Sequence, residues 1–113
     1  MMRERLGDLE HQTMLALLHL GEDAYAAPIV EELGERAGRE TTVAAVYIVL
    51  RRLEEKGLVE SELRDPGPDG GRDRRYFAVT ADGVEKLRQA RAAYTSLWDG
   101  LEATFGLVSG RRS

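Results

Sequence analysis

The 113-residue sequence predicts an α+β domain that is mainly α-helical, with three helices, a two-stranded β-hairpin and a long C-terminal helix. Three observations support this fold class. Apolar residues recur at helical spacing in the first half of the chain, they alternate with polar residues on both sides of a Gly- and Pro-rich loop, and a last apolar stripe runs to about residue 105. The hydrophobic fraction of 42% and the charged fraction of 32% are typical of a single soluble domain.

The first two helices are predicted in GDLEHQTMLALLHLG and YAAPIVEELGERAG. Apolar residues of the first segment extend beyond one narrow face, so this helix is expected to be largely buried. Asp8 is its expected N-cap and Gly21 its expected stop. In the second segment Pro28 lies near the start, where its missing N–H costs nothing, and Gly38 marks the end.

A third helix is predicted in TTVAAVYIVLRRLEEKG, from an N-cap at Thr41 or Thr42 to a stop at Gly57. Four apolar residues at i, i+3, i+4 and i+7 make one face of it part of the core. These residues are Val46, Val49, Leu50 and Leu53. The other face carries small residues in the first turn and then a tyrosine and arginines, so its N-terminal end can approach another surface closely.

A β-hairpin is predicted from LVESELR and RYFAVT, which alternate apolar and polar residues around the loop DPGPDGGRD. Arg72, Arg74 and Arg75 lie at the end of this loop, although the whole chain has a formal net charge of -4. Residues 41–80 carry seven basic and seven acidic side chains, whereas residues 1–40 are strongly acidic. A local basic patch is therefore compatible with an acidic protein.

The C-terminal helix is predicted to begin after an N-cap at Thr80 and to continue to about residue 105. At 1.5 Å per residue it would be about 36 Å long, which exceeds a core of this size. Part of its apolar stripe is therefore expected to pack on a second chain as a dimer interface. The stripe consists of Leu87, Ala90, Tyr94, Leu97, Trp98, Leu101 and Phe105.

The order helix, helix, helix, strand, strand, helix is that of a winged helix-turn-helix domain. It predicts such a domain in residues 1–80, a C-terminal dimerisation helix in 81–106 and a flexible tail in 107–113. In this fold the third helix enters the major groove of DNA, and the hairpin, or wing, reaches along the backbone. The predicted DNA contacts are Thr41, Thr42, Val43, Ala44, Tyr47, Arg51, Arg52, Arg72, Arg74 and Arg75.

Within this set the residues have different expected roles. Tyr47 is interpreted as lying on the face opposite the core, with its hydroxyl free to bind a phosphate. Thr42, Val43 and Ala44 can reach base edges, including a thymine methyl group, although Thr42 can equally be used as the N-cap. The arginines are expected to meet phosphates, and Arg51 and Arg52 can also pair with Glu54, Glu55 or the wing.

The segments LGDLEHQTMLALLHLGEDAYAAPIVEELGERAGRE, VYIVLRRLEEKGLVES and GGRDRRYFAVTADGVEKL resemble the PadR family of bacterial transcriptional regulators over about residues 6–90. The resemblance implies a homodimeric repressor of a roughly palindromic double-stranded DNA operator, released by a small aromatic or drug-like effector. It also implies that one long C-terminal helix pairs two subunits. Tyr47 and the basic wing match the family, whereas Ala44 replaces a frequent glycine and Asp73 a frequent proline.

Two alternatives to this hypothesis remain. The acidic net charge is compatible with a winged-helix module that docks another protein without binding DNA, and the C-terminal aromatic residues are compatible with a ligand-storage dimer. Trp98 itself has two interpretations: it anchors the dimer interface, or it lines an apolar cavity with Tyr94 in which flat aromatic ligands stack.

Several functional classes are not expected. The absence of cysteine excludes disulfides and thiol catalysis, and His11 and His19 are too far apart on one helix to share a metal ion. The sequence has no phosphate-binding glycine loop, nucleophile elbow or paired carboxylates, so no catalytic activity and no cofactor are predicted. No apolar run approaches the ~18 residues of a membrane span and no signal peptide is recognisable, which predicts a cytoplasmic protein without a membrane partner.

Overall fold

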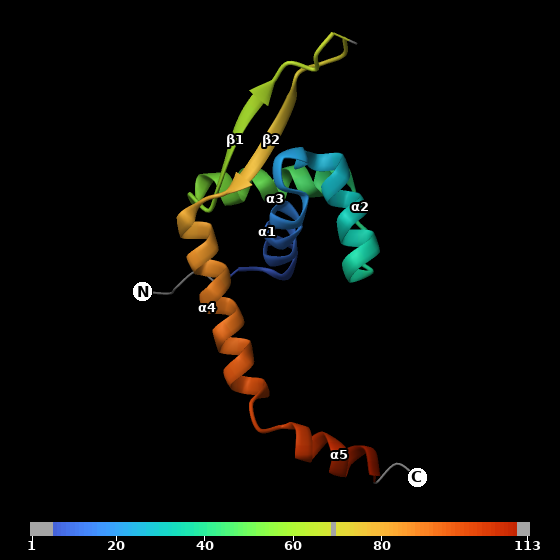
Figure 1. Ribbon diagram of the computed structural model, residues 1–113, viewed down its shortest axis with the longest axis vertical. Helices are drawn as coiled ribbons and strands as arrows, with labels where there is room; N and C mark the ends of the chain where they lie inside the picture. Colours follow the sequence, from blue (N-terminus) through green and yellow to red (C-terminus); the bar gives the residue numbers. More distant parts are fainter. Residues whose placement is uncertain (1–5, 69, 111–113) are drawn as a thin grey trace.

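The computed structural model describes residues 6–68 and 70–110. Its elements are α1 (Asp8–Leu20), the short 3-10 helix η1 (Gly21–Asp23), α2 (Ala26–Ala37), α3 (Val43–Glu55), β1 (Val59–Arg64), β2 (Arg74–Val79), α4 (Ala81–Trp98) and α5 (Glu102–Gly110). The first three α-helices form the head of the molecule, the hairpin extends from one side of it, and α4 leaves on the other side (Figure 1). The predicted order of elements is confirmed up to the start of α4.

The N-terminus of α1 differs from the prediction. Gly7 is the N-cap and Asp8 is already the first helical residue, so the predicted cap at Asp8 is wrong. Gly7 has no side chain that could accept from the N–H groups of the first turn, but Oε1 of Glu10 accepts a hydrogen bond from the N–H of Gly7 at 2.9 Å, which is the other half of a capping box. Gly21 ends the helix as predicted.

The ends of α2 and α3 follow the predicted capping residues. Pro28 lies in the first turn of α2 and Gly38 is its C-cap. The N-cap of α3 is Thr42, whose Oγ1 accepts a hydrogen bond from the N–H of Ala45 at 3.1 Å. This contact identifies Thr42, and not Thr41, as the N-cap of α3. Thr41 lies half-buried just before the helix.

The hydrophobic core lies where α1, α2 and α3 meet the base of the hairpin. The predicted core face of α3 is confirmed, since all of its four members are buried. The largest fully buried apolar side chains are Met14, Ile29, Val46, Leu50, Leu53 and Val59. This core holds α3 with one side inward and its other side exposed, which is the arrangement that a recognition helix requires.

The hairpin is antiparallel, with Val59 opposite Val79 at its base and Arg64 opposite Arg74 towards its tip. Val59 is buried at the base, whereas Leu63, near the tip on the same face, is 57% exposed. The N–H of Phe77 donates to the carbonyl of Ala24 at 2.8 Å, which attaches the free edge of β2 to the head. The wing is therefore fixed at its base and extends into solvent.

The prediction of one uninterrupted C-terminal helix is wrong. α4 ends at Trp98 and α5 begins at Glu102. Between them Gly100 has φ +79°, a left-handed conformation that glycine adopts readily and that a right-handed helix cannot contain. The predicted tail from residue 107 is also partly helical, because α5 continues to Gly110. The last three residues lie outside the described part of the chain.

Glu10 connects the start of α1 to the end of α3. Besides accepting from Gly7, it accepts a hydrogen bond through Oε2 from Nζ of Lys56 at 2.9 Å. Burial alone raises the pKa of Glu10, but the hydrogen bonds from Gly7 and Lys56 and the positive charges of Lys56 and Arg52 outweigh it, so the pKa lies below its ordinary value of 4.5. The ionised carboxylate therefore stabilises the folded state fully at pH values above the ordinary pKa of 4.5. This contribution is lost as the pH falls through the lower pKa of the folded state.

Replacing Glu10 with Gln is expected to lower the free energy of unfolding by about 1 kcal/mol at neutral pH, because the charged acceptor is lost. The difference from the wild type should shrink as the pH falls through the folded-state pKa, because the wild-type carboxyl then becomes protonated as well. Urea unfolding at about pH 7 and about pH 3 measures both values. The control is Glu31→Gln, an exposed position of α2. An equal loss at both pH values would contradict this role of the Glu10 charge.

Candidate nucleic-acid interface

The outward face of α3 carries apolar groups in its first half and arginines in its second half. Val43 and Ile48 are 49% and 55% exposed, although both are large apolar side chains. The exposed residues from the N-cap to the second arginine are Thr42, Val43, Ala44, Ile48, Arg51 and Arg52. The predicted contacts Thr42, Val43 and Ala44 are thus on the surface, whereas Thr41 is half-buried.

Ile48 is the residue of this face that the sequence analysis missed. It stands within a run of apolar residues, so its hydrophobicity suggested no particular role. At about 100° per residue, however, it falls about 200° from Val46, on the side of the helix away from the core. From this angular position the sequence could have indicated that Ile48 faces away from the core.

Tyr47 does not lie opposite the core, so that part of the prediction is wrong. Its half-buried ring packs against the core and meets the ring of Phe77 edge to face, with 6.1 Å between centroids and 86° between planes. The ring therefore connects α3 to the base of the wing. Its hydroxyl makes no hydrogen bond to any residue that the structure describes. A phosphate contact by Tyr47 accordingly stays a prediction.

Two of the three wing arginines already have partners inside the molecule. Nη1 of Arg75 donates to Oγ of Ser61 at 3.0 Å, and Ser61 in turn donates to Oε2 of Glu54 at 2.6 Å. The guanidinium of Arg74 lies 4.5 Å from the ring centroid of Tyr25, which is a cation–π contact. Arg72 is exposed in the loop. Arg75 is thereby connected to α3 and is only half exposed, whereas Arg72 and Arg74 are both exposed.

Arg64 is a fourth arginine of the wing that the sequence analysis did not select. Its guanidinium lies 4.3 Å from the ring centroid of Tyr76 and donates to the carbonyl of Glu22 at 3.0 Å. The rings of Tyr76 and Tyr25 meet edge to face at 5.3 Å, so Arg64, Tyr76, Tyr25 and Arg74 form one continuous row of contacts. This row connects the wing to Tyr25, the N-cap of α2. Sequence patterns could not reveal it, because Tyr25 is far from the hairpin in the sequence.

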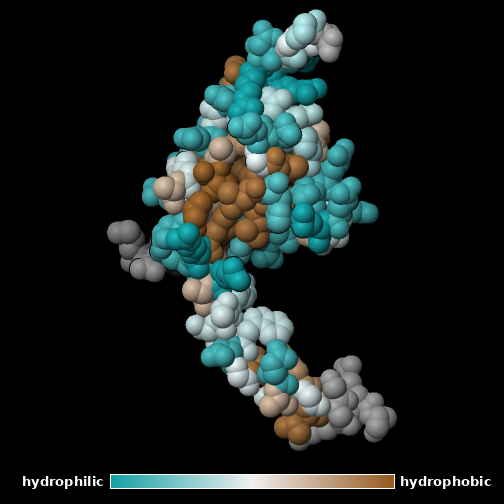
Figure 2. All heavy atoms as spheres, in the orientation of Figure 1, coloured by the Kyte–Doolittle hydropathy of each residue, from teal (hydrophilic) through white to brown (hydrophobic). Residues whose placement is uncertain are grey.

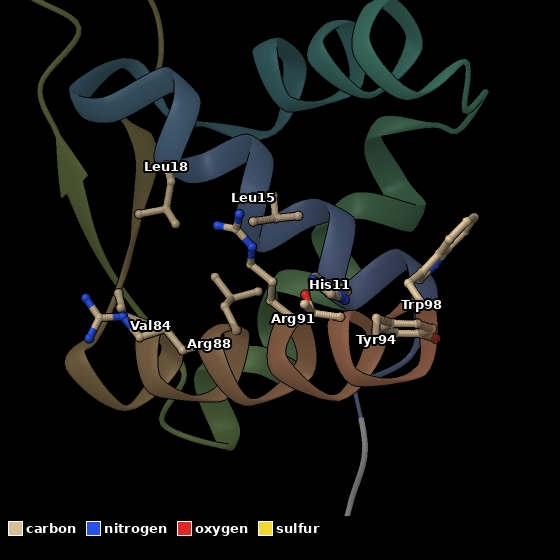
Figure 3. Close-up of a pocket in the computed structure, with 10 residues that line it drawn as sticks. His11, Leu15, Leu18, Val84, Arg88, Arg91, Tyr94 and Trp98 are labelled. Carbon is tan, nitrogen blue, oxygen red and sulfur yellow. The ribbon is translucent and has the colours of Figure 1, made fainter. Parts of the chain in front are cut away.

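A second surface feature is a groove of about 530 Å³ between α1 and α4. Leu15 and Leu18 project from α1 towards α4, and Tyr94 and Trp98 line its far end (Figure 3). Arg88, Arg91 and His11 add polar groups to this mostly apolar lining. Both residues predicted for an effector pocket therefore lie at one cavity.

The groove is part of a larger apolar surface. Leu15 and Leu18 of α1 are 42% and 50% exposed, and a hydrophobic patch faces outward over this part of the head (Figure 2). The prediction that α1 is largely buried is therefore correct for one side only. The buried side consists of Thr13, Met14, Ala16 and Leu17.

The residues predicted for a dimer interface differ in how far the single chain buries them. Leu87 is only 7% exposed and belongs to the core of the single chain, so its assignment to a dimer interface stays a prediction. Tyr94, Leu97, Trp98 and Phe105 are exposed, whereas Ala90 and Leu101 are half-buried. The rings of Trp98 and Phe105 meet at 5.3 Å across the bend between α4 and α5.

Comparison with known protein families identifies the chain. Residues 14–89, which include α2, α3, both strands of the wing and the start of α4, match the model of the transcriptional regulator PadR-like family. The chain belongs to this family. The family consists of transcriptional regulators, which agrees with the prediction that this PadR-like protein is not an enzyme. No curated protein showed significant similarity to it.

Solved structures agree with this assignment. A PadR-like transcription factor from Bacteroides fragilis is 29% identical, with a TM-score of 0.70 over 85% of this chain and 88% of that one. A PadR family regulator from Eggerthella lenta is 28% identical, with a TM-score of 0.61 over 84% of each chain. A PadR family regulator from Clostridium difficile shares the fold at 20% identity, with a TM-score of 0.72 over 88% of this chain and 99% of that one.

These comparisons establish the winged-helix fold of this PadR-like protein. Within residues 6–68 and 70–110, no helix has the length and apolar character needed to cross a membrane. The same residues contain no group of three or more side chains arranged to hold a metal ion.

Proposed function

We propose that this PadR-like protein is a homodimeric repressor that binds a double-stranded DNA operator through α3 and the wing. The observation that carries the proposal is the exposed face of α3 beside a wing that presents arginines, in a chain of a family of transcriptional regulators. Repression as the direction of regulation follows from the resemblance to the family.

The phosphate contacts are assigned to the exposed guanidinium groups. Arg51 and Arg52 on α3 and Arg72 at the wing tip are exposed, and Arg74 is held in place by Tyr25. A guanidinium that is already oriented loses less side-chain entropy when it binds a phosphate. Because salt screens charges beyond about 8 Å, this local cluster can attract DNA although the whole chain is acidic.

The homodimer is assigned to the uncovered apolar surfaces on α1 and α4. A helix that is apolar on more than one side is normally buried, yet Leu15 and Leu18 of α1 are exposed in the single chain. Leu97 and Trp98 are exposed apolar side chains of α4, and Trp98 lines the groove together with Leu15 and Leu18. Exposed apolar patches of this kind mark protein interfaces. A two-fold dimer would place two α3 helices in successive major grooves about 34 Å apart, on a roughly palindromic operator.

The effector is assigned to the groove between α1 and α4. Tyr94 and Trp98 offer flat surfaces on which a small aromatic molecule can stack. Such a ligand would release the operator by binding one spacing of the two heads better than the other. Trp98 is the only tryptophan in the chain, so its fluorescence reports occupancy directly. An aromatic compound that releases DNA without changing this fluorescence would contradict the assignment.

The DNA-binding proposal is tested by fluorescence anisotropy with operator fragments selected from genomic DNA, measured over a range of salt concentrations. We expect a preference over scrambled DNA and a logarithm of affinity that falls steeply with the logarithm of salt. Arg72→Ala and Arg51→Ala should each reduce this slope by about one unit. The matched control is Arg36→Ala on α2, where the arginine pairs with Glu32 instead.

The outcomes separate the two candidate functions. An unchanged slope for Arg72→Ala would remove the wing tip from the interface. If no fragment is preferred over scrambled DNA, the protein-docking module, which the acidic net charge favours, would replace the DNA-binding proposal.

A further inference from the structure

We propose that Ile48, together with Ala44 and Val43, recognises thymine methyl groups in the operator. This inference rests on the proposed DNA binding by α3 and specifies what the first half of that helix reads. It concerns a residue that neither the predicted contacts nor the likeness to known structures selects.

The first observation is that the surface has no role in the fold. Ile48 is 55% exposed on the side of α3 that faces away from the core, and Ala44 lies four residues earlier on the same face. Val43, in the first turn, is also about half exposed. Isolated exposed apolar residues are common, but here they gather on the helix that the fold presents to DNA.

The second observation is that the first half of α3 has almost no polar side chains. From Val43 to Leu50 the only side-chain polar group is the hydroxyl of Tyr47, whose ring is held against Phe77. Oγ1 of Thr42 is committed to the cap, since it accepts from the N–H of Ala45 at 3.1 Å. The amides and carboxylates that read adenine or cytosine by hydrogen bonds are therefore absent from this stretch.

The chemistry of the major groove supplies one partner for such a surface. The C5 methyl group of thymine is its apolar feature, and apolar side chains contact it. Residues near the N-terminus of a recognition helix are the ones that meet base edges. Ile48 is also well suited to a defined contact, because β-branched side chains have one strongly preferred χ1 rotamer in a helix.

The orientation of α3 further supports the assignment. Val49 and Leu50, next to Ile48 in the sequence, are buried in the core, and Tyr47 packs on Phe77. The rotation of α3 about its axis is thereby fixed, so Ile48 is presented outward in a constant position. Arg51 and Arg52 follow in the next turn, where they can bind phosphates while Ile48 faces the bases.

The test uses the selected operator and copies in which single thymines are replaced by deoxyuridine, which lacks the methyl group and keeps the same hydrogen bonds. The wild type should bind about fourfold more weakly for each contacted methyl that is removed. Ile48→Ala should weaken binding to the thymine operator. In this variant, deoxyuridine at the position that Ile48 contacts should cause no further loss of affinity. Circular dichroism confirms that the variant folds.

The control is Arg51→Ala, which should weaken binding to both operators by the same factor and so preserve the ratio between them. The inference is overturned if the wild type binds every deoxyuridine operator as tightly as the thymine operator, or if Ile48→Ala leaves the ratio unchanged. Failure to select any DNA would overturn the proposed function together with the inference, whereas selective binding without methyl dependence would overturn the inference alone.

Discussion

Replacing Gly83 with Ala is expected to destabilise the protein by about 3 kcal/mol or more. Gly83 is buried in the first turn of α4, and a Cβ there would overlap the carbonyl oxygen of Leu58. It would also lie 2.6 Å from Cγ1 of Val79 and 3.0 Å from Cε of Met14. The carbonyl of Leu58 cannot move freely, because it accepts a hydrogen bond from the N–H of Thr80 at 3.0 Å.

The matched control is Gly34→Ala in α2. A Cβ at Gly34 meets no atom within 4 Å, so the alanine should stabilise the helix by about 0.5 to 1 kcal/mol. Urea unfolding of the two variants compares the same chemical change in two environments. If Gly83→Ala were as stable as the wild type, the close approach of α4 to the base of the hairpin would be incorrect. Loss of stability in both variants would point to a general effect of the substitution.

Leu97→Glu is expected to convert the proposed homodimer into a folded monomer. Leu97 is 72% exposed on α4, so a carboxylate there is solvated in the single chain. In a dimer the same carboxylate would be buried without a partner, which is strongly unfavourable. Because each subunit contributes one α3, operator affinity should fall by about 100-fold or more when the two heads are no longer linked.

Light scattering after size exclusion measures the oligomeric state, and circular dichroism confirms that the fold is retained. The control is Leu63→Glu on the wing, which introduces the same charge at a position that is 57% exposed. This variant should remain a dimer. A dimer that survives Leu97→Glu would place this residue outside the interface and leave the apolar side of α1 and Trp98 as its remaining locations.

The elements with local patterns were predictable from the sequence. The spacing of Val46, Val49, Leu50 and Leu53 identified the buried face of α3, because the helical period relates neighbouring positions directly. Thr42 and Gly38 act as predicted at helix ends, and the hairpin forms where two alternating runs flank a loop. The same local features carried the resemblance to the PadR family, which the comparison of residues 14–89 confirms.

The break after α4 depends on a single backbone angle, the φ angle of Gly100. Apolar residues continue at helical spacing through Leu97, Leu101 and Phe105, and this pattern alone predicts one helix. Gly100 nevertheless adopts a positive φ, and the contact of Trp98 with Phe105 accompanies the bend. A glycine within a helical pattern permits such a bend without requiring it, so the sequence left this point open.

The sequence by itself therefore determined the order of the elements, the buried face of α3 and the family. The tertiary structure alone determined which side chains remain available for binding. In it Tyr47 lies at the edge of the core, Ile48 is exposed and Leu87 is in the core. The physical reason is that local periodicity shows which residues share a face. Whether that face is covered depends on contacts between residues that are far apart in the chain.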